Sequence, residues 1–153
     1  MLSRVLSCCV PRIVVDTDVF VASLLSDGGL ARQIVRACLT RAYQPIIGEA
    51  LFLEYEDVMA REDLFARSKT TETERSVVFD ALLSVCEWVP VYYLWRPNLR
   101  DEADNHLLEI AVAGAADAIV SRNQRDLTSG ELRFPSVRIL NPKQCLEVWP
   151  CQL

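Results

Sequence analysis

RIVVDTDVFVA, residues 12–22, is the stretch of this sequence that decides the fold. The branched apolar residues at 13–15 predict a short buried strand, and two carboxylates, Asp16 and Asp18, follow it one residue apart. A buried carboxylate without a partner is costly, so the end of such a strand is an unusual place for Asp16. The position indicates either a cap for the next helix or a functional group.

Helical and strand patterns alternate along the rest of the chain. We predict helices at 19–25, 30–40, 49–61, 71–86, 103–113 and 142–149. We predict strands at 12–15, 43–47, 88–94, 118–121 and 137–140. This alternation favours an α/β fold with a mostly parallel sheet covered on both faces. In such a fold, ligands bind beyond the carboxyl ends of the strands.

Composition limits the class of protein further. The 153 residues are the size of one domain, so we expect a single domain over 1–153, with 1–11 as a short N-terminal extension. No membrane span or convincing signal peptide is seen, and the six cysteines contain no CxxC, which favours a reduced cytoplasmic protein. A net charge of −5 argues against a broad basic nucleic-acid surface. It does not exclude a nuclease, because bound cations reverse the charge of a carboxylate site.

The predicted helix at 49–61 carries an acid on its apolar side. Leu51, Tyr55 and Val58 form the apolar stripe, and Glu54 projects into it, whereas Glu56 points away. A carboxylate on the face that packs on the sheet is either paired or a metal ligand, because burial disfavours its charge. A salt bridge from Glu54 to an arginine is the structural alternative.

The predicted helix at 103–113 repeats this arrangement. Asp104 shares a face with Leu107, while Glu109 is expected to point outward. Asp101 precedes the helix as a candidate cap. His106, the single histidine, falls off the Asp104 face, so a catalytic histidine or a histidine zinc site has little support.

Further polar residues follow the strand predicted at 118–121. Ser121, Asn123 and Asp126 come just beyond its carboxyl end, whereas Asp117 belongs to the opposite end and is read as structural. Four separate segments thus aim oxygen-bearing side chains at one edge of the sheet, and such sets select Mg²⁺ or Mn²⁺. The candidates are Asp16, Glu54, Asp104, Asn123 and Asp126.

These residues, in this order and spacing, resemble the PIN domain family, in particular the VapC-type toxins of bacterial toxin–antitoxin pairs. The likeness runs from residue 12 to residue 149 and rests on IVVDTDVFVASLL, GEALFLEYEDVMAR, RDEADNHLLEIAVAGAADAIVSRNQRDL and VRILNPKQCLEVW. It implies a three-layer α/β/α sandwich and Mg²⁺- or Mn²⁺-dependent hydrolysis of RNA phosphodiester bonds. It also implies a small antitoxin protein as partner, and a homodimer through helices near 64–79.

The resemblance assigns roles to individual residues. The acids of the family pattern fall on Asp16, Glu54 and Asp104, and the fourth position, commonly Asp, is Asn123 here, with Asp126 expected to supply the missing charge. The family's usual DxN after the first strand is DxD, which adds Asp18.

The remaining residues are expected to support the reaction. Asp16, Glu54, Asp104 and Asp126 are the expected metal ligands. Alternatively, Glu54 orients one of the other ligands or acts as the base that deprotonates the attacking water. Ser121 is expected to orient the attacking water, with Asp18 and Asp101 as supporting groups. The candidates for phosphate contact are Arg96, Arg100, Arg122 and Arg125.

Two other functions remain open on the sequence alone. IVVDTDVF superficially matches the aspartyl nucleophile of haloacid-dehalogenase-type phosphatases, although Phe20 stands where that pattern has Thr or Val. A PIN-like scaffold that has lost catalysis and serves in binding is the non-enzymatic alternative, motivated by Asn123 and the acidic surface.

Overall fold

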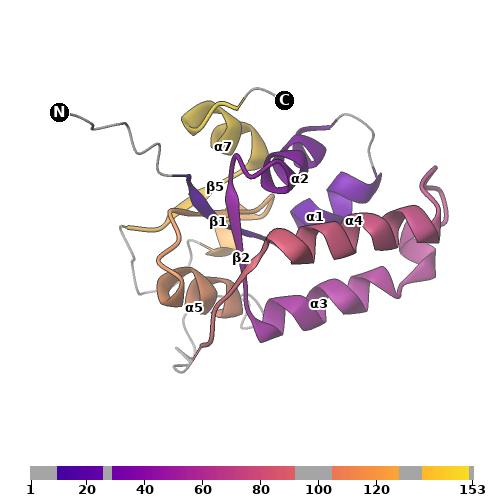
Figure 1. The fold of residues 1–153 in the computed structure, drawn as a ribbon, viewed down its shortest axis with the longest axis horizontal. Helices are drawn as coiled ribbons and strands as arrows, with labels where there is room; N and C mark the ends of the chain where they lie inside the picture. The colour runs from indigo at the N-terminus through magenta and orange to yellow at the C-terminus, as the bar shows by residue number, and fades with distance from the viewer. Residues whose placement is uncertain (1–9, 26–28, 92–104, 128–135, 152–153) are drawn as a thin grey trace.

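The structure, a computed structural model, describes residues 10–25, 29–91, 105–127 and 136–151. A five-stranded sheet with the strand order β3-β2-β1-β4-β5 lies at the centre, and each neighbouring pair is parallel (Figure 1). The strands are β1 Arg12–Val15, β2 Gln44–Ile47, β3 Glu87–Trp88, β4 Ala118–Val120 and β5 Arg138–Leu140. The predicted parallel sheet is therefore confirmed.

Helices cover both faces of this sheet. Figure 1 shows α5 on one side and α2 with α7 on the other, which gives the three layers of an α/β/α sandwich. The helices are α1 Thr17–Leu25, α2 Leu30–Leu39, α3 Glu49–Met59, α4 Glu72–Val85, α5 Asn105–Ala113, α6 Gln124–Leu127 and α7 Pro142–Val148, with a 3₁₀ helix, η1, at Glu62–Phe65. No helix within the described ranges has the length and apolar character needed to cross a membrane.

Strand β1 forms the middle of the hydrophobic core. Val14 is fully buried, as expected for a central strand covered on both faces. The hydroxyl of Tyr55 donates a hydrogen bond to the carbonyl of Val15, and the Tyr55 ring lies 4.7 Å from that of Phe20, centroid to centroid. Tyr55 therefore holds α3 against the end of β1 and the start of α1, which is where the candidate acids stand.

Local sequence signals set two of the helix starts. The Thr71 hydroxyl accepts a hydrogen bond from the Glu74 backbone N–H at 3.1 Å, and the Glu74 carboxylate accepts one from the Thr71 N–H, which forms a capping box. Asn141 caps α7 in the same way, with Pro142 at the first helical position. Each such cap stabilises its helix by about 1 kcal/mol. Both predicted helix starts are confirmed.

Arg12 fixes the amino edge of the sheet. Its guanidinium donates to the Gly114 carbonyl at 2.8 and 3.1 Å and to the Glu87 carboxylate at 2.6 Å. Its backbone N–H donates to Asp117 Oδ2 at 2.8 Å, which confirms the structural role expected of Asp117. These contacts connect β1, β3 and the turn after α5, so the amino edge is held by matched charges.

The expected orientation of Glu109 is wrong. Its side chain is only 3% exposed, and its Oε1 atom has no hydrogen-bond partner among the described residues. The reason is that α5 packs against β1, β2, β4 and α3, so more than one face of the helix is covered. A single apolar stripe underestimates the buried surface of such a helix.

Candidate active site

The register of the sheet brings two polar residues together beyond β1 and β4. Val15 pairs with Val120 across these parallel strands, so the residues that follow them, Asp16 and Ser121, are neighbours. The Asp16 N–H donates to the Val120 carbonyl at 2.9 Å. Strand order reverses direction between β1 and β4, and this switch point is where open α/β sheets bind their ligands.

Asp16 is buried and is oriented by a short chain of hydrogen bonds. Its side chain is 7% exposed, and the Ser121 hydroxyl donates to its Oδ2 atom at 2.7 Å. Ser121 Oγ in turn accepts from the Asn123 backbone N–H at 3.0 Å. Over the part of the chain that the structure describes, no arginine or lysine forms an ion pair with Asp16. The carboxylate is thus held in one orientation, and within the described residues its charge is not paired with an arginine or a lysine.

Electrostatics at this edge disfavours the ionised acids. Burial raises the pKa of Asp16, an effect opposed by the hydrogen bonds from Ser121 and the Thr17 backbone and reinforced by the charge of Glu54. The pKa of Asp18 is raised to about 6, first by burial and then by the charge of Asp16. The Arg122 N–H donates to Asp18 Oδ2 at 3.1 Å, which opposes that shift.

Glu54 is paired with a histidine instead of an arginine. Its Oε2 atom lies 2.9 Å from Nε2 of His106, which joins α3 to α5. The hydrogen bond from His106 is the largest cause of the lowered pKa of Glu54. Sequence reasoning gave His106 no role, because the contact is made between two helices and leaves no local pattern. The apolar stripe around Glu54 is confirmed, since Leu51, Tyr55 and Val58 are buried.

The other sequence candidates are placed as follows. Asn123 is exposed and immediately follows Arg122, whose backbone contacts Asp18, so both lie at the carboxyl edge. Asp126 and the exposed Arg125 belong to α6, a four-residue helix that follows β4 and was not predicted. Four candidates lie outside the described residues: Arg96, Arg100, Asp101 and Asp104.

The donor set suits a hard divalent cation. The described residues hold no group of three or more His, Cys, Asp or Glu side chains placed to bind a metal ion. They do hold Asp16, Asp18 and Glu54: the charge of Glu54 raises the pKa of Asp16, and the charge of Asp16 raises the pKa of Asp18. Carboxylate oxygens are the ligands that Mg²⁺ and Mn²⁺ prefer, and a cation would relieve both the burial cost and the repulsion.

Fold and site together define a known class. The PIN domain family model matches residues 12–125, most of the chain, and the chain belongs to this family. Among solved structures, it is similar to a chain of VapBC2 from Rickettsia felis, crystallised bound to a DNA fragment from the promoter. The TM-score is 0.56 at 12% sequence identity, over 85% of this chain and 98% of that one, and the likeness shows a shared fold. No curated protein matches the sequence.

Proposed function

We propose that this protein is a metal-dependent endoribonuclease that hydrolyses RNA phosphodiester bonds. PIN domains are generally nucleases, which supports hydrolysis as the activity. The observation that carries the proposal is the buried Asp16 at the switch point of the sheet, oriented by Ser121 and close to the charges of Asp18 and Glu54. A buried carboxylate at the ligand-binding edge of the sheet lowers stability. A cation bound to it would offset that cost and explain its position.

The metal would be Mg²⁺ or Mn²⁺, held by Asp16, Glu54, Asp104 and Asp126, with Asn123 beside them. When bound, such an ion would polarise the phosphate and lower the pKa of a water molecule, so that the hydroxide formed by loss of a proton could attack phosphorus. Ser121 orients Asp16, since its hydroxyl donates to that carboxylate, so orienting the water is not its role in the proposal.

The surrounding residues position the acids and the substrate. His106 holds Glu54 in place across the gap between α3 and α5. Arg122 and Arg125 are exposed beyond β4, where their guanidinium groups would contact RNA phosphates, and Arg96 and Arg100 have the same proposed role.

The biological setting proposed is a toxin–antitoxin pair in the cytoplasm. The similar solved structure is a VapBC2 assembly on promoter DNA, which supports a small antitoxin protein as partner of this chain. A homodimer is part of the same proposal.

Cleavage of a mixed RNA pool tests the activity. We expect products with Mn²⁺ or Mg²⁺, none with EDTA, and a loss of at least about 100-fold in Glu54→Gln. The matched control is Glu56→Gln, the same substitution two residues away on α3, where the side chain is exposed. If Glu54→Gln cleaves as fast as Glu56→Gln, the proposed site is wrong.

The same experiment separates the alternatives. A protein that binds RNA but never cleaves it would be a catalytically impaired scaffold. Release of phosphate from a phosphomonoester, with RNA left intact, would point to the phosphatase instead. The match of the family model to the PIN domain favours the nuclease over both.

A further inference from the structure

A cavity lies at the other end of α1 from the acids. It has a volume of about 460 Å³, within the range of small-molecule pockets. Helices α1, α2 and α4 and the segment before α4 form its walls, and Asp18 is separated from Leu24 by six residues of α1, about 9 Å at 1.5 Å per residue. The cavity therefore stands apart from the candidate active site.

The cavity has a basic lining on an apolar wall. Its basic residues are Arg32, Arg36, Lys69 and Arg75, against one acid, Glu74. The Glu74 carboxylate is engaged in the capping box with the Thr71 N–H. The apolar lining comes from Leu24, Val35, Leu39 and Val78. A protein with net charge −5 thus concentrates positive charge in one hollow.

Arg75 is the unusual member of this lining. Its side chain is 9% exposed, and its guanidinium carbon lies 4.3 Å from the centroid of the Phe65 ring. One hydrogen bond, from Nη1 to the Thr70 carbonyl at 2.7 Å, holds it in place. Within the described ranges no carboxylate forms an ion pair with it. A buried cation is normally paired, so Arg75 is short of an anion.

The wall of the cavity that carries Arg75 is preformed, because hydrogen bonds within the protein already hold it. The hydroxyl oxygens of Ser68 and Thr70 lie 3.4 and 3.3 Å from the Leu24 carbonyl and 2.6 Å from each other, so one hydroxyl donates to that carbonyl while the other donates to its neighbour. These bonds attach the segment before α4 to the end of α1. Arg75 then bonds to the same segment through Thr70, so its position is fixed and little ordering is needed on binding.

We propose that this cavity binds a nucleotide. Its phosphates lie against the guanidinium groups of Arg36 and Arg75, which match phosphate oxygens in geometry and charge. Its ring packs on Leu39 and Val78, one turn from those arginines on α2 and α4. The volume of the cavity and its mixed basic and apolar lining fit a molecule with both parts, which neither bare phosphate nor a nucleoside supplies.

Calorimetric titration in EDTA tests this inference, because EDTA removes metal ions that would bridge an anion to the acidic site. We expect ADP to bind one per chain and to saturate below about 1 mM, pyrophosphate to bind more weakly, and adenosine to give no saturable heat. Absence of saturable ADP binding overturns the proposal. Pyrophosphate binding as tightly as ADP overturns the contact with the ring.

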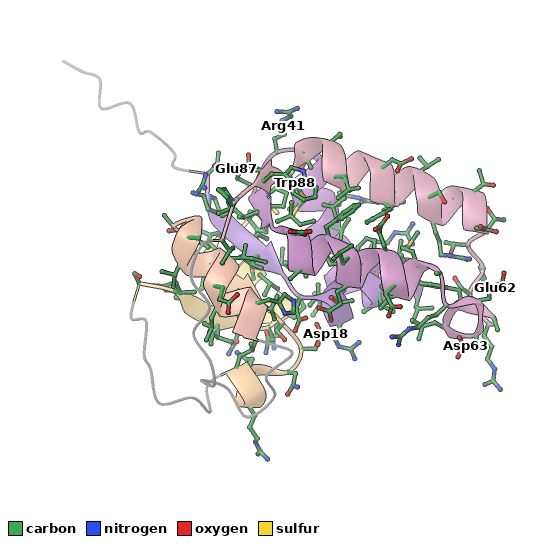
Figure 2. The ribbon with its side chains drawn as sticks, turned by 90° about the horizontal axis from the view of Figure 1, so that it is seen from below. Asp18, Arg41, Glu62, Asp63, Glu87 and Trp88 are labelled. Atoms are coloured by element: carbon green, nitrogen blue, oxygen red, sulfur yellow. The ribbon has the colours of Figure 1, made fainter. Side chains whose placement is uncertain are left out.

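Variants locate the site. Arg75→Gln should weaken ADP binding at least tenfold, about the value of one charge-assisted hydrogen bond, and Arg36→Gln several-fold. Arg36 is exposed, so its variant remains informative even if Arg75→Gln fails to fold. The matched control is Arg41→Gln: Arg41 follows α2 and is exposed, as Figure 2 shows, and it does not line the cavity. Asp16→Asn should leave ADP binding unchanged. Equal affinity in all these variants contradicts the assignment.

Discussion

Glu87 and Asp16, carboxylates at the amino and carboxyl ends of the strands, have pKa shifts in opposite directions. At the amino edge, Glu87 and Asp117 accept hydrogen bonds from Arg12, and the pKa of Glu87 is lowered by that contact. At the carboxyl edge, Asp16 forms no ion pair with an arginine or lysine in the described part of the chain, and burial raises its pKa. The two sites stand at opposite ends of β1: Arg12 is the first residue of the strand, and Asp16 follows its last residue, Val15.

The carboxylates paired with Arg12 stabilise the fold, whereas the desolvated carboxylates after β1 lower its stability. Figure 2 shows Asp18 well apart from Glu87, which lies beside Trp88. Paired acids at the amino edge stabilise the sheet, whereas the acids beyond β1 are tolerated at a cost in free energy. Proteins commonly retain such destabilising groups at functional sites. The comparison therefore predicts opposite effects on stability and activity at the two edges.

The largest effect is expected at Asp16. Asp16→Asn should lower metal-dependent RNA cleavage at least about 100-fold while raising the free energy of unfolding of the metal-free protein by about 1 kcal/mol. The amide keeps an oxygen for the Ser121 hydroxyl and removes the buried charge. Cleavage assays and urea unfolding in EDTA measure the two changes. Asp80→Asn, exposed on α4, is the control for both, and a destabilised Asp16→Asn protein would contradict the contrast.

Arg12 should show the opposite behaviour. Arg12→Met removes the bonds to Gly114 and Glu87, and we expect the free energy of unfolding to fall by about 2 kcal/mol. The residue is at the far edge from the acids, so cleavage by the folded fraction should stay within about twofold of wild type. Urea unfolding and cleavage at a temperature where the variant is folded check this. Loss of activity without loss of stability would show that Arg12 acts in cleavage and not in holding the fold.

Ser121 tests the orientation of Asp16. Ser121→Ala should reduce cleavage about tenfold, since an oriented carboxylate becomes free to rotate. The effect should fall on kcat more than on KM, and more Mn²⁺ should be needed for half-maximal rate. Ser121→Thr, which keeps the hydroxyl, should recover part of the activity. A variant that is merely less stable, with an unchanged metal requirement, would argue against this role.

The smallest effect is a difference in pH dependence between the edges. The pKa of Asp18 in the fold, about 6, exceeds its ordinary value of 3.8, so the folded chain binds the proton more tightly than the unfolded chain. Stability of the metal-free protein should therefore be highest below about pH 4 and should fall as pH rises through about 6. Asp18→Asn should reduce this slope, and an unchanged slope would contradict the prediction.

Glu87 should give a slope of opposite sign. Its pKa is lowered in the fold, so its contribution is present above the ordinary value and is lost as pH falls through the lowered one. Because the pair with Arg12 is half-exposed, Glu87→Gln should cost only about 0.5 kcal/mol at pH 7 and less at pH 3. Urea unfolding at the two pH values distinguishes these outcomes.

Local patterns were sufficient to predict much of this molecule. The branched run at 12–15 predicted β1. The helix starts predicted near 71 and 142 agree with the capping boxes at Thr71 and Asn141, because such signals depend on neighbouring residues only. The place of Asp16 beyond a buried strand also follows from local sequence. The start of α1 at Thr17, two residues before the predicted start, is a small difference of the same local kind.

Contacts between segments that are distant in the sequence could not be predicted from local patterns. Glu54 pairs with His106 from another helix, and α5 buries Glu109 because four elements surround it. Arg75 stands in the first turn of α4 and looks solvated in the sequence, yet Phe65 and Thr70 enclose it. Helices as short as α6 have too little periodicity to predict.

Titration of the metal-free protein with Mn²⁺, followed by calorimetry, tests the central claim most directly. We expect saturable binding to the wild-type chain and its loss in Asp16→Asn, with Asp80→Asn binding as wild type does. Absence of saturable Mn²⁺ binding in the wild-type protein, or equal binding in Asp16→Asn, would contradict it.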